Sequence, residues 1–298
     1  MTEPIAHWPG RMVGDVHVRS TPEGGADQAV FVHGLAGSAT NWTDLMGELR
    51  DLVTGHAIDL PGAGYSPAPP DGDYSVSAHA RAVIGLLERT GPAHLFGNSL
   101  GGAVCVTAAA ARPDLVRSLT LVSPALPDLV PRYGPARVAA SAAPGLGEWV
   151  ADRLRFLPAE QRINASLAMC YADVSVVHPA RIRDAVEELR RRDGLPYAGR
   201  ALIGSARGIV AEYFRRGEQN LWRQAARVTA PTLIIHGRRD RLVRPATARR
   251  ALTSFPQARL VLLRNAGHVA QMEVPEAVAA EARRLILETR LGNAPLPS

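Results

Sequence analysis

The chain has 298 residues, 46% of them hydrophobic, which favours one α/β domain with a substantial insertion over two independent domains. All 34 basic residues are arginine, so chemistry that needs an amine, such as a Walker A lysine or a Schiff base, is excluded. The net charge is only +6, and guanidinium groups do not titrate near neutral pH, so the pI of about 10.0 is no sign of a nucleic-acid partner.

Targeting and metal signals are missing from the sequence. There is no basic start followed by an apolar run, and no 18-residue stretch of uncharged apolar residues, so we expect a cytoplasmic protein without stable membrane insertion. Cys105 and Cys170 lie far apart in the sequence, and we interpret both as packing residues. Because neither H-E-x-x-H nor C-x-x-C occurs, we expect no metal and no cofactor.

Apolar runs in the first third of the chain predict alternating strands and helices. Strands are expected over Val16–Ser20, Ala29–His33 and Val53–Ile58, and a helix over Val76–Arg89. Asp59 follows the third strand and precedes a proline and two glycines, so we interpret it as a structural turn residue.

The stretch Gly97-Asn98-Ser99-Leu100-Gly101 matches G-x-S-x-G. An expected strand, Ala93–Phe96, precedes it, and a small-residue helix over Gly101–Ala111 follows it. A sharp strand-to-helix turn lifts the serine hydroxyl and leaves no room for a Cβ on either flanking glycine. Ser99 is therefore the candidate nucleophile.

The second half of the core continues the alternation. We expect strands over Leu119–Val122, Thr232–His236 and Leu260–Leu263, with a helix over Ala246–Ser254. This order predicts the α/β class, with a mostly parallel β-sheet flanked by helices.

Between residues 125 and 230 the strand rhythm stops, and proline-punctuated helices such as Ile182–Arg192 and Gly208–Arg216 are expected. We predict an inserted helical cap here. It contains 16 arginines and 11 acidic residues. Attraction for anionic ligands or a lipid surface is one interpretation, but solvated helix faces explain the excess better.

A serine nucleophile needs a base and an acid that orients it, in the chain order Ser, Asp or Glu, His. His268 follows the last apolar strand in Asn265-Ala266-Gly267-His268, where a loop at the carboxyl edge of the sheet reaches Ser99. Asp240 follows the preceding strand and is the best orienter, ahead of Asp114 and Asp128.

These segments together resemble the α/β-hydrolase family. The resemblance also rests on His33-Gly34-Leu35 and on a turn of the form D-x-P-G-x-G-x-S that begins at Asp59. It implies a core of residues 1–124 and 231–298 with a cap of 125–230, and an oxyanion hole formed by the backbone N–H groups of Leu35 and Leu100.

The expected function is that of a serine hydrolase that cleaves a carboxylic ester, or a related acyl compound, through an acyl-enzyme on Ser99. The expected partner is a small-molecule substrate with an apolar acyl part, bound between the sheet edge and the cap. Aromatic and apolar cap residues are candidates for the lining of that pocket: Met169, Tyr171, Trp149, Phe156 and Trp222.

Two alternatives stay open. Asn98 and the stretch from His268 to Glu273 are similar to carbon-carbon bond hydrolases of vinylogous diketones, although Val269 stands where those enzymes usually have tryptophan. A ligand-sensing receptor that keeps the hydrolase fold is the other alternative.

Overall fold

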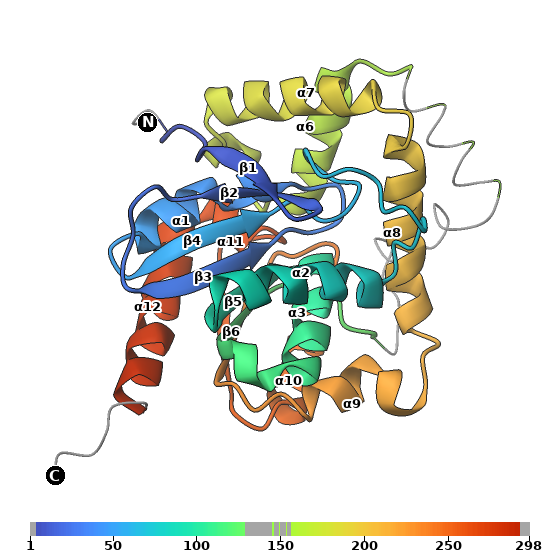
Figure 1. Cartoon of the computed structure of the whole chain (residues 1–298). Coiled ribbons are helices and arrows are strands. Elements are labelled where there is room, and N and C mark those ends of the chain that lie inside the picture. Colours follow the sequence, from blue (N-terminus) through green and yellow to red (C-terminus); the bar gives the residue numbers. More distant parts are fainter. Residues whose placement is uncertain (1–3, 129–144, 146–148, 150–152, 154–155, 293–298) are drawn as a thin grey trace, which may run out of the picture.

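The computed structural model describes residues 4–128, 145, 149, 153 and 156–292. Its centre is an eight-stranded sheet in the order β1-β2-β4-β3-β5-β6-β7-β8. Figure 1 labels the first six of these strands. Strand β2 pairs antiparallel with both of its neighbours, β1 and β4, and all other neighbouring strands pair parallel. The strand bounds are β1 Gly10–Val13, β2 Val16–Ser20, β3 Asp27–Val32, β4 Val53–Ile58, β5 Ala93–Asn98, β6 Val116–Val122, β7 Thr232–Gly237 and β8 Ala258–Leu263.

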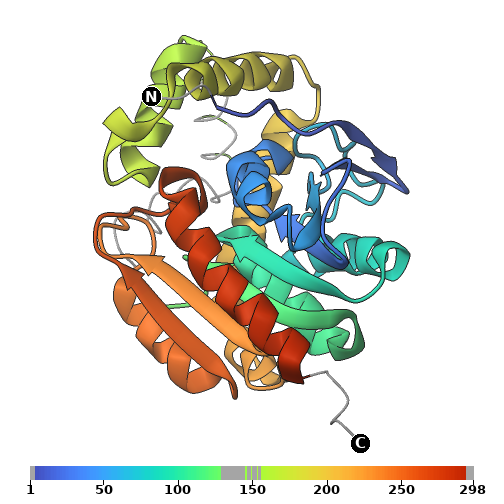
Figure 2. The same ribbon diagram turned by 90° about the vertical axis from the view of Figure 1, so that its left-hand side faces the viewer.

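Helices cover both faces of this sheet (Figure 2). The core helices are α1 Thr43–Leu49, α2 Val76–Thr90, α3 Leu100–Ala111, α10 Pro245–Ser254, α11 Ala270–Glu273 and α12 Pro275–Gly292. Local chemistry sets the ends of α2: the Ser75 hydroxyl accepts a hydrogen bond from Ala78 N–H at the start, and Gly91 takes a positive φ of 84° after the last residue.

The strand residues divide the core into two apolar layers. Val30 and Val32 pack with α2 and α3, whereas Ala29 and Phe31 point to the opposite face, toward α1 and α12. This two-residue alternation is what a pleated strand buried on both faces requires. The parallel sheet with helices on both faces is thus confirmed.

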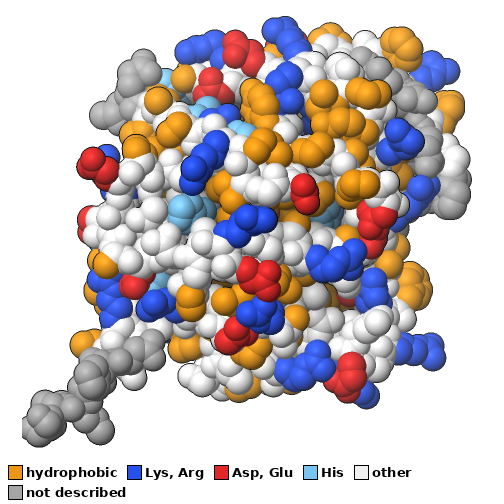
Figure 3. All heavy atoms as spheres, viewed as in Figure 1, with side chains coloured by type: hydrophobic (Ala, Val, Ile, Leu, Met, Phe, Trp, Pro, Cys, Tyr) orange, Lys and Arg blue, Asp and Glu red, His pale blue; other side chains and the backbone are white. Residues whose placement is uncertain are grey.

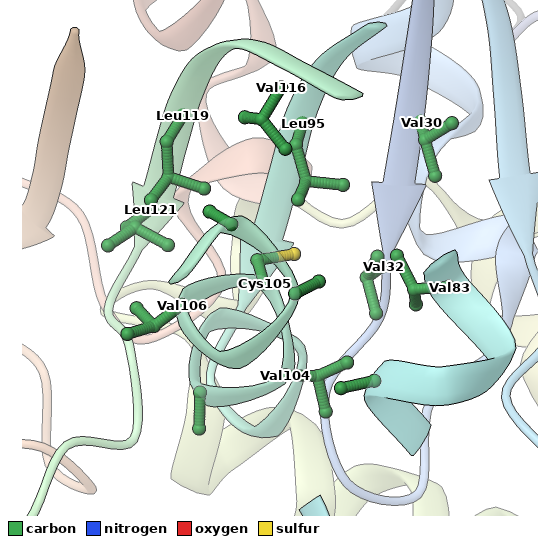
Figure 4. Packing of buried hydrophobic residues seen from close by; sticks show 14 of the residues in the cluster. Val30, Val32, Val83, Leu95, Val104, Cys105, Val106, Val116, Leu119 and Leu121 are labelled. Carbon is green, nitrogen blue, oxygen red and sulfur yellow. The ribbon is translucent and has the colours of Figure 1, made fainter. Parts of the chain in front are cut away.

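Figure 4 shows the layer beneath α3. Val104, Cys105 and Val106 contribute side chains from the helix, and Leu95 and Leu119 meet them from β5 and β6. Cys105 is fully buried there, and burial raises the pKa of its thiol well above the usual range. It is a packing residue, as the sequence predicts.

The inserted segment follows β6 and carries four described helices and two short 3-10 turns. Their bounds are α6 Ala159–Cys170, η3 Val174–Val176, α7 Pro179–Asp193, α8 Ala198–Glu212, η4 Gly217–Gln219 and α9 Leu221–Ala225. The helix expected over 208–216 overlaps only the C-terminal part of α8, which begins ten residues earlier and ends at Glu212, so residues 213–216 are not helical. At the far end of the segment, Leu221 and Ala225 pack into the core layer beside α3.

Several described arginines of the insertion are paired with carboxylates. Arg162 binds Asp193 across helices, and Arg181 on α7 binds Asp44 on α1. On the face shown in Figure 3, basic and acidic side chains are interspersed. The pairing favours the interpretation that these arginines lie on solvated helix faces and form ion pairs between elements.

No helix among the described residues combines the length and the apolar character needed to cross a bilayer.

Candidate active site

The turn after β5 has the strained geometry that the sequence predicts. Ser99 adopts φ 52° and ψ −116°, a conformation rare for a residue with a side chain. Its backbone is held on both sides, because Ser99 N–H donates to Val122 O at 3.1 Å and Ser99 O accepts from Ala125 N–H at 2.9 Å.

Close backbone packing explains the glycines around Ser99. A Cβ on Gly97 would lie 2.5 Å from Gly101 O and 2.7 Å from Cys105 Sγ, and one on Gly101 would overlap Val32 O. No side-chain rotation can relieve a clash with backbone. The requirement that both glycines lack a Cβ is confirmed.

The loops after β7 and β8 bring Asp240 and His268 together, although they lie 28 residues apart. His268 Nδ1–H donates to Asp240 Oδ2 at 2.9 Å, and both residues are buried. Because a carboxylate only accepts hydrogen bonds, this contact leaves Nε2 as the acceptor of the neutral imidazole. That tautomer is the one a general base requires.

Asp240 is held as an anion. Burial favours its neutral form, but the charge and the hydrogen bond of His268 oppose this more strongly, and the pKa of Asp240 falls to about 2. Its Oδ1 also accepts from the N–H groups of Leu242 and Val243, at 2.8 and 2.9 Å. His236, which sequence reasoning missed, places Nε2 3.4 Å from Asp240 Oδ2.

The other carboxylates considered as orienters lie elsewhere. Asp114 is exposed and binds Arg112 at 2.7 Å. Asp128 lines the central cavity and lies 3.9 Å from Arg244. Of the three carboxylates, Asp240 is the one that contacts His268.

His33 has a structural arrangement. Its Nε2 accepts from Leu60 N–H at 3.0 Å and its Nδ1–H donates to Gly34 O at 2.8 Å, so both ring nitrogens are occupied. Burial lowers the pKa of His33, which keeps the ring neutral. This ring fixes the carbonyl of Gly34, the residue directly before Leu35.

The loop of Leu35 lies against the nucleophile. A Cβ on Gly34 would be 3.2 Å from Ser99 Cβ. Leu100 is the first residue of α3, and a small second cavity of about 30 Å³ is lined by both leucines. Within the described part of the chain, the backbone N–H groups of Leu35 and Leu100 donate to no acceptor. Neither amide is used within the described fold, and their role as an oxyanion hole stays a prediction.

A cavity of about 530 Å³ opens over this arrangement, between the carboxyl edge of the sheet and the insertion. Ser99 and His268 line its floor together with Leu35 and Asn98. Most of its remaining walls are apolar side chains of the insertion and nearby loops, among them Leu126, Ile163, Leu167, Met169, Leu189, Ile209, Val210, Val243 and Met272.

Two of the five expected lining residues, Met169 and Tyr171, line the cavity. The other three do not. Phe156 is 86% exposed and Trp149 57% exposed, while Trp222 donates its indole N–H to Pro127 O and lies beneath Arg250. Sequence alone could not assign them, because the helical packing of the insertion decides which side chains face inward.

Among the described residues, no group of three or more His, Cys, Asp or Glu side chains is arranged to hold a metal ion.

Comparisons with known proteins agree with this geometry. A sequence model described as alpha/beta hydrolase fold matches residues 30–275. A 2-hydroxy-6-oxononadienedioate/2-hydroxy-6-oxononatrienedioate hydrolase of Cupriavidus pinatubonensis is 26% identical over 88% of this chain and 87% of its own length. Lipases and an esterase are also found among bacterial relatives at 25 to 27% identity.

Some relatives are longer than this chain. The dihydrolipoyllysine-residue acetyltransferase component of the acetoin cleaving system of Cupriavidus necator is 30% identical over 84% of this chain, but the chain spans only 61% of that protein. Among solved structures, an esterase of Thermogutta terrifontis superposes with a TM-score of 0.70 at 24% identity, covering 92% of this chain and 94% of that one. With the match to the family model extending over most of its length, this chain belongs to the α/β-hydrolase family.

Proposed function

We propose that this enzyme is a serine hydrolase that cleaves a carboxylic ester, or a related acyl compound, through an acyl-enzyme on Ser99. The observation that carries the proposal is the shared cavity. Ser99 on its strained turn and His268, itself bound to Asp240, line the same cavity floor. Relatives named lipases and an esterase support the choice of an ester.

The mechanism follows from the roles of these groups. His268 Nε2 takes the proton of Ser99 as the oxygen attacks the carbonyl, and returns it to the departing alcohol. Asp240 fixes the imidazole tautomer and stabilises its cationic form without taking the proton. The N–H groups of Leu35 and Leu100 stabilise the oxyanion, and water then releases the acyl group.

The cavity walls support a substrate with an apolar acyl part. Apolar side chains make up most of the lining, although charged residues such as Asp128, Glu188 and Arg192 also line the cavity. Desolvation of an acyl chain contributes roughly 0.8 kcal/mol per buried methylene group. A cavity of about 530 Å³ is in the usual range for small-molecule sites.

We further propose that residues 125–230 act as a cap over a core formed by residues 1–124 and 231–298. Helices α6, α7 and α8 of this segment supply cavity walls, which supports the assignment. In this arrangement the cap selects the substrate and the core performs the chemistry.

The test is hydrolysis of p-nitrophenyl esters of increasing chain length by wild type, Ser99→Ala and a matched control. Ser254→Ala removes a hydroxyl from the exposed end of α10 and serves as that control. We expect Ser99→Ala to lower kcat by about 10⁶-fold, as loss of a serine nucleophile does elsewhere. Equal turnover by wild type and Ser99→Ala would refute the acyl-enzyme.

A carbon-carbon bond hydrolase is the second candidate. The relative from Cupriavidus pinatubonensis favours it, because that protein is named a hydrolase of 2-hydroxy-6-oxononadienedioate and 2-hydroxy-6-oxononatrienedioate. The similarity of Asn98, directly before Ser99, to the corresponding residue of carbon-carbon bond hydrolases also favours it. Loss of the absorbance of a vinylogous diketone, with no release from any ester, would choose this activity over ester cleavage.

A further inference from the structure

The carboxylate of Glu273 joins two parts of the molecule that are distant in sequence. Glu273 ends α11 and is only 8% exposed. Its Oε2 accepts from Gly267 N–H at 2.6 Å, in the loop that carries His268. Its Oε1 accepts from the N–H groups of Ala172 and Asp173 in the cap, at 2.8 and 3.1 Å.

His268 is attached to the same two parts by its own backbone. Its N–H donates to Cys170 O in the cap at 2.7 Å, while its carbonyl accepts from Asn98 Nδ2 beside Ser99 at 3.1 Å. The packing is close, because a Cβ on Gly267 would overlap Cys170 O. The loop of His268 and cap residues 170–173 therefore form one hydrogen-bonded unit.

A carboxylate is the side chain that suits this position. Three N–H groups converge on it from two directions, and only an ionised carboxylate offers acceptors on both oxygens. A glutamine would accept with one oxygen and turn an NH₂ group toward the remaining N–H donors. Buried N–H groups left without an acceptor destabilise the arrangement that buries them.

We propose that Glu273 is a positioning residue for His268. Glu273 holds the loop of His268 against cap residues 170–173, so that the imidazole lies at Ser99 only while this contact is intact. The inference rests on the proposed role of His268 as the base. It makes this part of the cap a component of the catalytic geometry as well as a wall of the cavity.

The kinetic experiment compares Glu273→Gln and Glu273→Asp with wild type, on the ester that wild type hydrolyses best. Glu276→Gln is the matched control, since Glu276 is exposed three residues further along. We expect Glu273→Gln to lower kcat per folded molecule by about 100-fold, since misplacement by about 1 Å has such an effect, with KM changed by less than about threefold. Glu273→Asp, which keeps the charge but is one methylene shorter, should fall between the two.

A second measurement needs no substrate. Cys170 belongs to this unit and its side chain lines the cavity. Burial raises the pKa of its thiol to about 11, so the thiol should react slowly with a disulfide reagent. Loss of the Glu273 contacts should make the thiol of Cys170 react roughly tenfold faster, because local opening exposes it. Cys105 stays buried in the core, and Cys170→Ala identifies which signal belongs to Cys170.

Two results would overturn the proposal. One is a Glu273→Gln variant that melts earlier but keeps wild-type kcat per folded molecule and wild-type thiol reactivity, which indicates a stabilising role alone. The other is a Glu276→Gln variant that shows the same loss of kcat. Faster thiol reaction in Glu273→Gln would support the contact between loop and cap. If Ser99→Ala were fully active at the same time, the proposed chemistry would be refuted while this contact would still stand.

Discussion

Two buried aspartates in this molecule each bind a histidine, in different regions. Asp59, after β4, accepts from His17 Nδ1–H at 2.8 Å and from the backbone N–H groups of Ala39 and Tyr65 at 2.6 and 2.9 Å. Asp240, after β7, accepts from His268 Nδ1–H at 2.9 Å and from two backbone N–H groups. In both regions the aspartate pKa is lowered, against the effect of burial, by its histidine partner.

The two pairs differ in what the second imidazole nitrogen faces. His17 packs its Nε2 against the backbone of Gly10 on β1, and its ring lies beside Tyr65. His268 lines the central cavity with Ser99. A buried His–Asp contact is thus no mark of a base by itself, and access of the free nitrogen to a nucleophile is what separates the two regions.

The largest test of this difference replaces each histidine with glutamine. His268→Gln should lower kcat by about 10⁶-fold, because a serine without its base is a weak nucleophile. His17→Gln should reduce stability and leave kcat per folded molecule near the wild-type value. Steady-state ester hydrolysis, with the folded fraction taken from circular dichroism, measures both.

An equal loss of kcat in the two variants would break the comparison, because it would place His17 in the reaction. Retained activity in His268→Gln would break it from the other side and remove His268 as the base.

Much of the fold is predictable because its signals are local. Seven of the eight strands follow from apolar runs, and the turn at Ser99 follows from its glycines. The edge strand β1, with its exposed residues, has no apolar run, and α1 is only seven residues long, so neither produced a periodic pattern. Helix α12 also went unpredicted, although its 18 residues bury an apolar stripe in the core.

The candidate site is predictable to the extent that residue type and chain order restrict it. Ser99, Asp240 and His268 could be named because each follows an expected strand. The contacts of Glu273 with Ala172 and Asp173 span about 100 residues of sequence and use backbone donors, which have no sequence signature. The contact between the side chains of His17 and Asp59, 42 residues apart, has no sequence signature either.

The acid dependence of stability is expected to show an effect of intermediate size, and it compares Asp240 with Asp59. The pKa of Asp240 is about 2 in the folded chain against an ordinary 3.8, so its ionisation stabilises the fold above pH 4, and this contribution is lost as the pH falls from 4 to 2. The shift corresponds to roughly 2 to 3 kcal/mol. Between pH 4 and pH 2 the free energy of unfolding should therefore decrease less in Asp240→Asn than in wild type. The two decreases should differ by about that energy.

Urea unfolding at a series of pH values measures this difference. Asp59→Asn is the companion variant: the pKa of Asp59 is lowered too, so it should also flatten the acid limb. Only Asp240→Asn should at the same time lose ester turnover at pH 7. Parallel acid limbs in wild type and Asp240→Asn would contradict the assigned ionisation of Asp240.

The smallest expected effect comes from Gly10→Ala. The added Cβ would overlap Nε2 of His17, so the ring must move and weaken its contact with Asp59. Because β1 is an exposed edge strand that can shift, we expect stability to fall by only about 1 kcal/mol. Thermal unfolding measures this against Arg11→Ala, an exposed neighbour on the same strand. Ester turnover per folded molecule should not change, because the ring of His17 does not line the cavity. A loss of turnover with unchanged stability would mean that the His17 region is coupled to the active site.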